Sequence, residues 1–551
     1  MALTLEKGFM GVFEFSFSKN FYRENTLNNI NTTSQHTNVD SYFYGVTLIC
    51  VIIYILTNVI LNYSVNWMHP EVIIRAMRSA LVNGIDFQLA DLGQIFDFNT
   101  LDGVSRARFV SYAFEIIDVK FRLWLFQYIP PHPSLSLTYI FIFLSPVLLF
   151  KFINNVTNNR NTAWSAVLLY VLSTGFLSGS TLLFHAGKPI ANFFVIYCLY
   201  LASKLSRLAA NQHKFRKNEY FSLLLFFCVL FITLFTDEGA YFVLVALPIL
   251  FYDDILKFSL KTDGYFSITK RLPEMTFEIA SKPGGISMIV LYLLTFVLYL
   301  IFITFVFPII ALKMGLGTFN FWGFVGSGSS LLDNVLNFNF TAANARDLVT
   351  TQLIPISTPY LAYFYTVYYA YFLWMFTHLT RFQKRIFFRY VIVLILFFIF
   401  QTLLFSTHGG GRVVSTYYYG STFPIYLVLP LSILLSVKGR WLKSANKAVL
   451  IFLLIVSAHN FPVVSHQWMG RHNAMYRQFF PEETKMMHDR FQTLSYDMVV
   501  KAWQTRKDQK ALSELKPLFP VISYGLFVEL ELMELKESDL EEYVNRKLVL
   551  H

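Results

Sequence analysis

The chain has 551 residues, of which 55% are hydrophobic, 18% are aromatic and only 14% are charged. This leaves too little polar surface for a water-soluble globule of this size, in agreement with a mean hydropathy of +0.48. The net charge of +11 would favour nucleic acid as a partner in a soluble protein, but here the basic residues cluster in short loops between apolar runs. The composition therefore predicts an integral, multi-pass membrane protein and argues against a nucleic-acid partner.

Apolar runs of about 17–25 residues recur along the chain, the length that a helix needs to cross the hydrocarbon core. We expect an all-α polytopic fold with about eleven transmembrane helices. The predicted spans are residues 43–62, 137–153, 163–184, 189–203, 220–236, 239–252, 287–313, 358–379, 388–406, 417–437 and 446–461. Residues 1–42 lack the apolar segment of a signal peptide and are predicted to be a cytoplasmic N-terminal arm.

The basic residues predict the orientation. With a cytoplasmic N-terminus, the loops on the inside and the span ends beside them carry Lys151, Arg160, Lys204, Arg207, Lys214, Arg216, Lys217, Lys257, Lys261, Lys270, Arg271, Lys282, Arg381, Lys384, Arg385, Arg389, Lys438, Arg440, Lys443 and Lys447. Because basic loops stay in the cytoplasm, the N-terminus is predicted inside and the C-terminus outside. Residues 462–551 are polar and contain the strand-like run PVISYGLFVELELMEL, which predicts a small extracytoplasmic α/β domain.

Ionisable residues also occur at the outer ends of the spans, where they are costly unless they face a polar cavity or one another. They are His185 and Lys188 in one turn, Asp237 and Glu238 in a second, and His408 and Arg412 in a third. Their presence on one side predicts a shared cavity within the transmembrane domain, residues 43–461. In the GGGR turn, backbone N–H groups can approach an anion while the guanidinium of Arg412 binds it, as expected for phosphate.

Each of these residues also has a purely structural interpretation. Lys188 can reach the membrane surface from a span end, and His185 can cap a helix. Asp237 and Glu238 can be solvated turn residues, and the glycines before Arg412 can form a hinge. The sequence leaves open whether a divalent metal joins Asp237 and Glu238.

Two outer loops are long. Loop 63–136 contains Asp86, Asp91, Asp97 and Asp102, followed by a segment that places Phe109, Ile116 and Trp124 near one helical face and Arg108, Glu115 and Asp118 elsewhere. This pattern predicts a helix lying on the outer membrane surface. Loop 315–357 is rich in Gly, Ser and Asn, which suits a mobile segment able to cover a cavity.

The acidic stretch DLGQIFDFNTL after the first span, followed by SRARFVSYAFEI and a second span, resembles the opening of GT-C glycosyltransferases. The protein O-mannosyltransferase and aminoarabinose transferase branches are the nearest comparison. The resemblance implies an enzyme that moves a sugar from a polyprenyl-phosphate-linked donor to a hydroxyl of a glycan, lipid or protein acceptor, on the extracytoplasmic face of a cell-envelope membrane.

Such a transfer needs a carboxylate base for the acceptor hydroxyl and cations for the departing phosphate. Asp91 is the first candidate for the base, ahead of Asp97 and Asp86, although Asp91 can also be a helix cap or turn residue. The candidates for the donor phosphate are Lys188, Arg412, His408 and His185, with Asp237 and Glu238 lining the acceptor side or the cavity.

Other functions remain open at this point. An O-antigen polymerase or ligase also works on the outer face, but its largest outer loop is expected in the second half of the chain. A secondary transporter or flippase of lipid-linked sugars predicts an inverted repeat and ionisable residues near mid-span. We find no such repeat, and the lack of a Walker motif argues against an ATP-driven pump.

Overall fold

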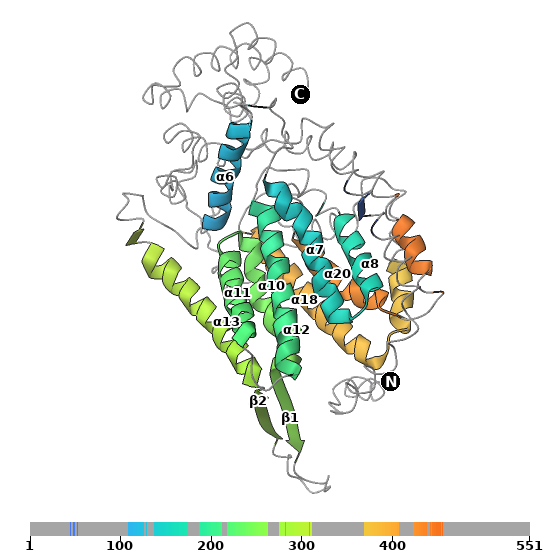
Figure 1. The fold of residues 1–551 in the computed structure, drawn as a ribbon. Helices are drawn as coiled ribbons and strands as arrows, with labels where there is room; N and C mark the ends of the chain where they lie inside the picture. Colours follow the sequence, from blue (N-terminus) through green and yellow to red (C-terminus); the bar gives the residue numbers. More distant parts are fainter. Residues whose placement is uncertain are drawn as a thin grey trace, which may run out of the picture. The chain divides into compact units, whose positions relative to one another are not determined.

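The structure, a computed structural model, describes residues 108–125 and 128, 137–173 and 176, 187–211, 217–262, 275–281, 283–310 except 308, 369–406, 422–437 and parts of 45–52 and 441–455. Contacts divide the chain into Met1–Ile49 and Cys50–His551, and the elements below all lie in the second unit. In chain order (Figure 1) they are α6 (Phe109–Leu125), α7 (Thr138–Thr157), α8 (Arg160–Val171), α10 (Gly187–Asn211), α11 (Lys217–Leu234), η3 (Glu238–Phe242), α12 (Val243–Ile255), β1 (Leu256–Thr262), β2 (Met275–Ser281), α13 (Pro283–Ile301), η4 (Phe302–Val306), α18 (Arg381–Ser406) and α20 (Phe423–Leu435).

The described residues are almost entirely helical, and four helices are long and apolar enough to cross a membrane. These are Thr138–Thr157, Gly187–Leu208, Ile289–Val306 and Arg381–Leu403, and shorter apolar helices cover Glu219–Leu234, Gly239–Phe251 and Phe423–Leu435. The predicted helical fold is confirmed to this extent. The count of eleven spans and the orientation stay predictions. The predicted arm 1–42, the predicted outer loop 315–357 and the predicted domain 462–551 lie outside the described residues.

Helix α10 lies at the centre of the described helices. It packs against α7, α11, α12 and α13 and also contacts α6. Figure 1 shows α7, α11 and α12 running alongside it. Its side chains Ile190, Val195, Leu199 and Leu205 are all buried. Other helices thus enclose most of α10, and its exposed cations Lys204 and Arg207 lie towards its C-terminal end.

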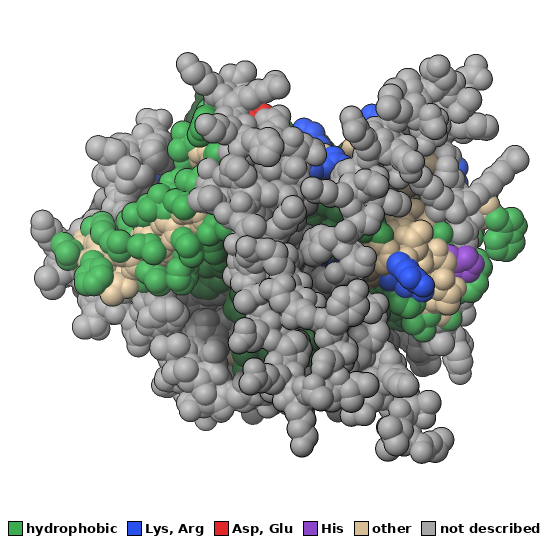
Figure 2. All heavy atoms as spheres, turned by 90° about the horizontal axis from the view of Figure 1, so that it is seen from below, with side chains coloured by type: hydrophobic (Ala, Val, Ile, Leu, Met, Phe, Trp, Pro, Cys, Tyr) green, Lys and Arg blue, Asp and Glu red, His purple; other side chains and the backbone are tan. Residues whose placement is uncertain are grey.

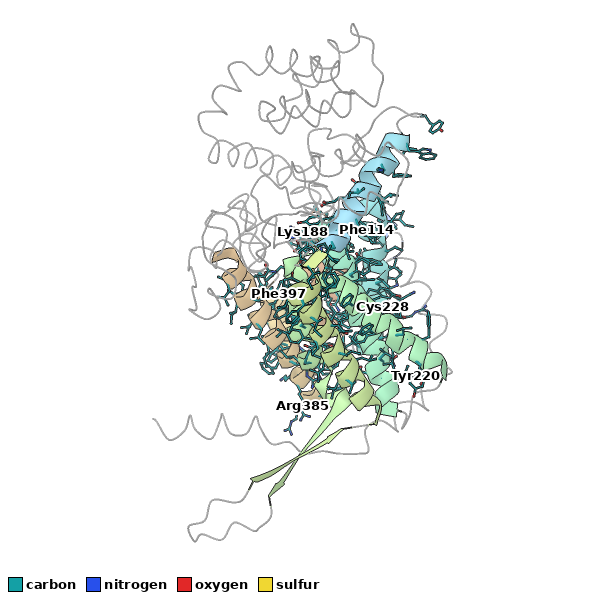
Figure 3. The ribbon with its side chains drawn as sticks, turned by 90° about the vertical axis from the view of Figure 1, so that its left-hand side faces the viewer. Phe114, Lys188, Tyr220, Cys228, Arg385 and Phe397 are labelled. Atoms are coloured by element: carbon teal, nitrogen blue, oxygen red, sulfur yellow. The ribbon has the colours of Figure 1, made fainter. Side chains whose placement is uncertain are left out.

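Helices that follow one another in the chain, such as α10 and α11, run in opposite directions, so basic residues distant in sequence lie at the same end of the helices. Hydrogen bonds join the helices there: Asn155 Nδ2 donates to Ser203 Oγ, and Gln383 Nε2 donates to Ser436 Oγ. Figure 3 shows Arg385 towards this end and Lys188 towards the other. Figure 2 views the molecule from the lower side of Figure 1, where blue Lys and Arg side chains lie beside green hydrophobic ones.

The span predicted over 163–184 begins as α8 but leaves the helical conformation at Leu172. Asn159 caps the start of α8 by accepting hydrogen bonds from the backbone N–H groups of Asn161 and Thr162. At the other end, Ser173 Oγ donates to Tyr170 O and accepts from Phe176 N. Serine hydroxyls that bond the nearby backbone compete with helix continuation, so a continuously apolar run does not give a continuous helix here.

Strands β1 and β2 were not predicted. They pair antiparallel in a hairpin, with Leu256 opposite Ser281 and Thr262 opposite Met275. Sequence analysis treated this basic segment as a cytoplasmic loop between spans. Apolar and polar residues alternate in LKFSLKT and MTFEIAS, which is the pattern of a β-strand. Sequence analysis searched this region only for membrane spans and basic residues and therefore missed it.

Helix α13 presents a long apolar surface. Val290, Leu293, Val297 and Ile301 are all exposed on it, and Phe305 continues this surface on η4. Exposed leucine and phenylalanine at this density suit contact with lipid tails and not with water.

Candidate functional site

Asp237 occupies the turn between α11 and η3. Its carboxylate Oδ1 accepts a hydrogen bond from Gly239 N at 3.0 Å, so the side chain caps the short helix that follows. Only 2% of the side chain is exposed. The solvated turn that sequence analysis left open for Asp237 is therefore wrong, because the protein itself encloses this carboxylate.

Lys188, in the first turn of α10, provides the nearest cation. Its Nζ lies 2.5 Å from Asp237 Oδ1, and its side chain is only 1% exposed. The interpretation of Lys188 as a side chain that reaches out to the membrane surface is therefore also wrong. Lys188 and Asp237 come from two outer turns that sequence analysis expected to share a cavity, and the structure joins them directly.

Arg108, immediately before α6, completes the cluster. Its Nη2 lies 3.5 Å from Asp237 Oδ2, and its side chain is 8% exposed. We call Arg108, Lys188 and Asp237 the buried ionic cluster. Sequence analysis gave Arg108 no role. The sequence feature that could have indicated a role for Arg108 is its position between the acidic loop and an apolar helix.

The start of α6 is fixed to the α11–η3 turn by its backbone as well as by charge. Val110 N donates to Phe235 O at 3.1 Å, and Ser111 Oγ donates to Thr236 O at 2.5 Å. The ring of Phe109 packs 4.5 Å from that of Phe307, at the end of the π-helical η4. These contacts hold Arg108 in place.

The surface position predicted for α6 is not what the structure shows for its charged residues. Glu115, Asp118 and Lys120 are all buried, as is Arg108. Asp118 Oδ1 accepts a hydrogen bond from Leu137 N at 2.5 Å, at the start of α7. A helix whose charged side chains are enclosed by protein is a packed element of the fold, although its apolar periodicity is that of a surface helix.

Gly187 permits the close approach of α10 to α6. A Cβ atom at this position would lie 2.9 Å from Ser111 Oγ and 3.2 Å from Ser111 Cβ. Ser111 cannot move away freely, because its hydroxyl bonds Thr236 O. The absence of a side chain at residue 187 thus lets the neighbouring Lys188 reach Asp237.

We expect Gly187→Ala to lower the free energy of unfolding by about 1–3 kcal/mol, because the added methyl overpacks this contact. Thermal unfolding in detergent measures the change. In a Ser111→Gly background, Gly187→Ala should cost much less, since the opposing atoms are absent. Gly45→Ala is the control, because a Cβ at Gly45 meets nothing within 4 Å. Equal melting temperatures for Gly187→Ala and wild type would contradict the close approach.

Opposing effects act on the pKa of Asp237. Burial raises the pKa, whereas Lys188, Arg108 and the hydrogen bond from Gly239 lower it, and the net result is a pKa below its ordinary value. The N-terminus of α10, which begins at Gly187, adds its partial positive charge on the same side. The carboxylate is therefore ionised at neutral pH and holds both cations in position.

On its other side the cluster borders α18 and α20. A Cβ atom on Gly239 would lie 3.3 Å from Asp237 Oδ1, 3.6 Å from Thr422 Oγ1 and 3.7 Å from Gln401 Nε2. Below these polar atoms, Phe397 packs against Tyr426 with ring centroids 4.3 Å apart. A polar layer thus rests on an aromatic one. Sequence analysis did not single out Gln401, although it interrupts the apolar run that ends at Phe400.

The other predicted site residues cannot be placed. The loop aspartates and the remaining outer-turn residues lie outside the described residues: Asp86, Asp91, Asp97, His185, His408 and Arg412. The backbone of Glu238 is described, within η3, but its side chain is not. A cavity shared by all the outer turns therefore stays a prediction. Within the described part of the chain, no group of three or more His, Cys, Asp or Glu residues could hold a metal ion.

Comparisons with protein-family models, with curated proteins and with solved structures found no match to this chain. The function must therefore be inferred from the residues and their geometry.

Proposed function

We propose that the chain is a membrane glycosyltransferase of the GT-C type. It would move a sugar from a polyprenyl-phosphate-linked donor to a hydroxyl of a glycan, lipid or protein acceptor on the extracytoplasmic face. The observation that carries the proposal is the buried ionic cluster of Arg108, Lys188 and Asp237. It gathers charged side chains from three distant segments at one end of the helices, which is a costly arrangement without a use for the charge.

The distribution of the remaining cations supports an outward-facing cluster. Lys151, Arg160, Lys204, Arg381 and Arg385 are exposed, and they belong to the opposite helix ends. Exposed cations at span ends are the orientation signal of a membrane protein and favour the cytoplasmic side. The end that carries the buried ionic cluster would then face outwards, in the leaflet that holds the lipid-linked donor.

The acidic loop and the cluster are adjacent in the sequence. The segment that contains Asp86, Asp91 and Asp97 leads directly into Arg108, which Asp237 holds. A base in this loop and cations in the cluster would thus flank one reaction site. The cluster also lies at helix ends and not at mid-span, which favours a reaction at the membrane surface over a transport path.

In the proposed sugar transfer, one bond to the anomeric carbon forms and another breaks. Asp91 accepts the proton of the acceptor hydroxyl while that oxygen forms a bond to the anomeric carbon of the sugar. The bond between the anomeric carbon and the phosphate oxygen breaks, and the polyprenyl phosphate leaves with the bonding electrons. Lys188 and Arg108 stabilise the negative charge that develops on this leaving group, together with Arg412.

The test uses the purified full-length chain in lipid vesicles with a radiolabelled polyprenyl-phosphate hexose. We expect Lys188→Met to weaken donor binding about 10- to 100-fold, since a charge-assisted hydrogen bond contributes about 1.5–3 kcal/mol. Lys204→Met is the matched control, because Lys204 is exposed at the opposite end of the same helix. Gel filtration and circular dichroism verify that both variants fold. A wild-type chain that neither binds nor transfers from any such donor would contradict the proposal, as would unchanged binding by folded Lys188→Met.

A further inference from the structure

Gln401 is a buried polar side chain whose hydrogen-bonding capacity is unused in the structure. It lies on α18 and has no exposed surface, and among the residues that the structure describes neither Oε1 nor Nε2 has a hydrogen-bond partner. Buried amides normally find partners, because leaving their groups unpaired costs stability. A fully unpartnered carboxamide therefore calls for a specific explanation.

The position of Gln401 links it to the buried ionic cluster. Its Nε2 and Asp237 Oδ1 both lie within 4 Å of the point where Gly239 would carry a Cβ, and Thr422 Oγ1 is equally near. Thr422 is 2% exposed. Asp237, Gln401 and Thr422 therefore line one polar spot around a glycine, contributed by η3, α18 and the residue before α20.

The chemistry of this spot differs from that of a phosphate site. A carboxamide offers two N–H donors and a carbonyl acceptor, and a threonine hydroxyl both donates and accepts. A phosphate has only acceptor oxygens at neutral pH, so Gln401 Oε1 would face it unpaired. Sugar hydroxyl groups supply donors and acceptors together and would satisfy both ends of the amide.

The aromatic side chains beneath this polar spot are also suited to binding a sugar. Phe397, one helical turn before Gln401, packs with Phe242 and Tyr426, so the polar spot has an aromatic floor. Sugar rings combine polar edges with apolar C–H faces, which suits hydrogen bonds at the edge and an aromatic side chain below.

We propose that Gln401, with Asp237 and Thr422, binds hydroxyl groups of the sugar on the polyprenyl-phosphate donor and so selects the sugar that is transferred. This inference rests on the proposed glycosyltransferase function. Lys188 and Arg108 bind the phosphate of the donor, and Gln401 recognises the sugar that is bonded to this phosphate. Gln401 has no exposed surface, so the sugar can reach it only through a local movement of the surrounding residues.

Gln401→Met tests the proposal, since methionine has a similar length and no hydrogen-bonding amide. Without ligand, the variant should melt at a higher temperature than wild type, because it removes an unpaired buried amide. It should bind sugar-free polyprenyl phosphate as wild type does. For the best of a panel of polyprenyl phosphates carrying a hexose, an N-acetylhexosamine or a pentose, it should lose at least about tenfold in affinity.

Thr402→Val is the matched control. Thr402 is equally buried on the next position of α18, but its hydroxyl already donates to Phe398 O at 2.8 Å. We expect its preference for the sugar-bearing donor to equal that of wild type. A loss as large as that of Gln401→Met would show a general effect of altering α18 and would overturn the inference.

The remaining outcomes separate the two proposals. If wild type binds polyprenyl phosphate but no sugar in the panel improves binding, or if Gln401→Met keeps the improvement, only the sugar-selection inference is wrong. A ligand-free Gln401→Met protein that melts at a lower temperature would show that the amide is already satisfied, by a buried water for example, and would also overturn it. If wild type binds none of these lipids, the glycosyltransferase proposal fails and the inference fails with it.

Discussion

Replacing Asp237 by asparagine is expected to lower the free energy of unfolding by about 3–5 kcal/mol, the usual cost of breaking a buried ion pair by removing one partner. The carboxylate lies against Lys188 and Arg108 with almost no exposure to solvent. Asparagine keeps the size of the side chain and its capping oxygen but leaves two buried cations facing a neutral group. Equilibrium unfolding in detergent, followed by tryptophan fluorescence, measures the loss.

Two further variants show whether charge is the cause. Glu219→Gln removes a carboxylate from the first turn of α11, near the opposite end of the helix that leads to Asp237, and should change stability by less than about 1 kcal/mol. The triple replacement Arg108→Met, Lys188→Met and Asp237→Leu should recover a large part of the Asp237→Asn loss, because it removes the three charges of the cluster together. Stability of Asp237→Asn within 1 kcal/mol of wild type would show that the cluster is not a stabilising ion pair.

The same variant should change how stability depends on pH. Burial raises the pKa of Asp237, but Lys188 and Arg108 outweigh it, so the pKa in the folded protein is lower than the ordinary value near 4. A carboxyl with a lowered folded pKa stabilises the protein above its unfolded pKa, and this contribution is lost as the pH falls through the folded pKa. Wild type should therefore lose stability below about pH 4, and Asp237→Asn should lack this part of the acid dependence.

Asp91→Asn is expected to reduce the rate of sugar transfer by roughly 10²-fold or more while donor binding stays intact, because asparagine cannot accept the acceptor's proton. Arg412→Ala should instead weaken donor binding as well as transfer, since the guanidinium contacts a charge that is present before reaction. Measuring binding and transfer separately, with a purified polyprenyl-phosphate sugar, distinguishes the two effects.

Asp102→Asn serves as the control within the same acidic loop and should transfer sugar at the wild-type rate. Unchanged transfer by Asp91→Asn would shift the role of base to Asp97 or Asp86. If all three of these aspartates can be replaced without loss, loop 63–136 does not supply the base and the proposed mechanism is wrong.

The helices were predictable because their signal is local. A run of apolar residues such as 189–203 is enough to predict a span, and α10 occupies that place. The interruption of a span was not predictable to the same degree, since the end of α8 at Val171 depends on how one serine, Ser173, bonds the backbone. The β1–β2 hairpin was missed because its short alternating strands lie in a segment read only for its charge.

The site was predictable only in part. Lys188 and Asp237 were found because ionisable residues in very short turns between spans are costly. Their direct pairing was not, because it depends on how α10 and α11 pack. Arg108 and Gln401 were overlooked for opposite reasons: Arg108 looked like one of several surface cations, and Gln401 carries no charge. Both acquire meaning only through their place beside Asp237.

The docking of α6 onto the α11–η3 turn has a consequence for biosynthesis. Ser111 and Thr236, which form one of its hydrogen bonds, lie 125 positions apart in the chain. At about 5–20 residues per second, the ribosome needs roughly 6–25 s to make the intervening segment. Arg108 therefore cannot meet Asp237 until α7, α8, α10 and α11 have left the ribosome. The docking of α6 is therefore a late step of assembly, and a nascent chain truncated before Asp237 cannot complete it.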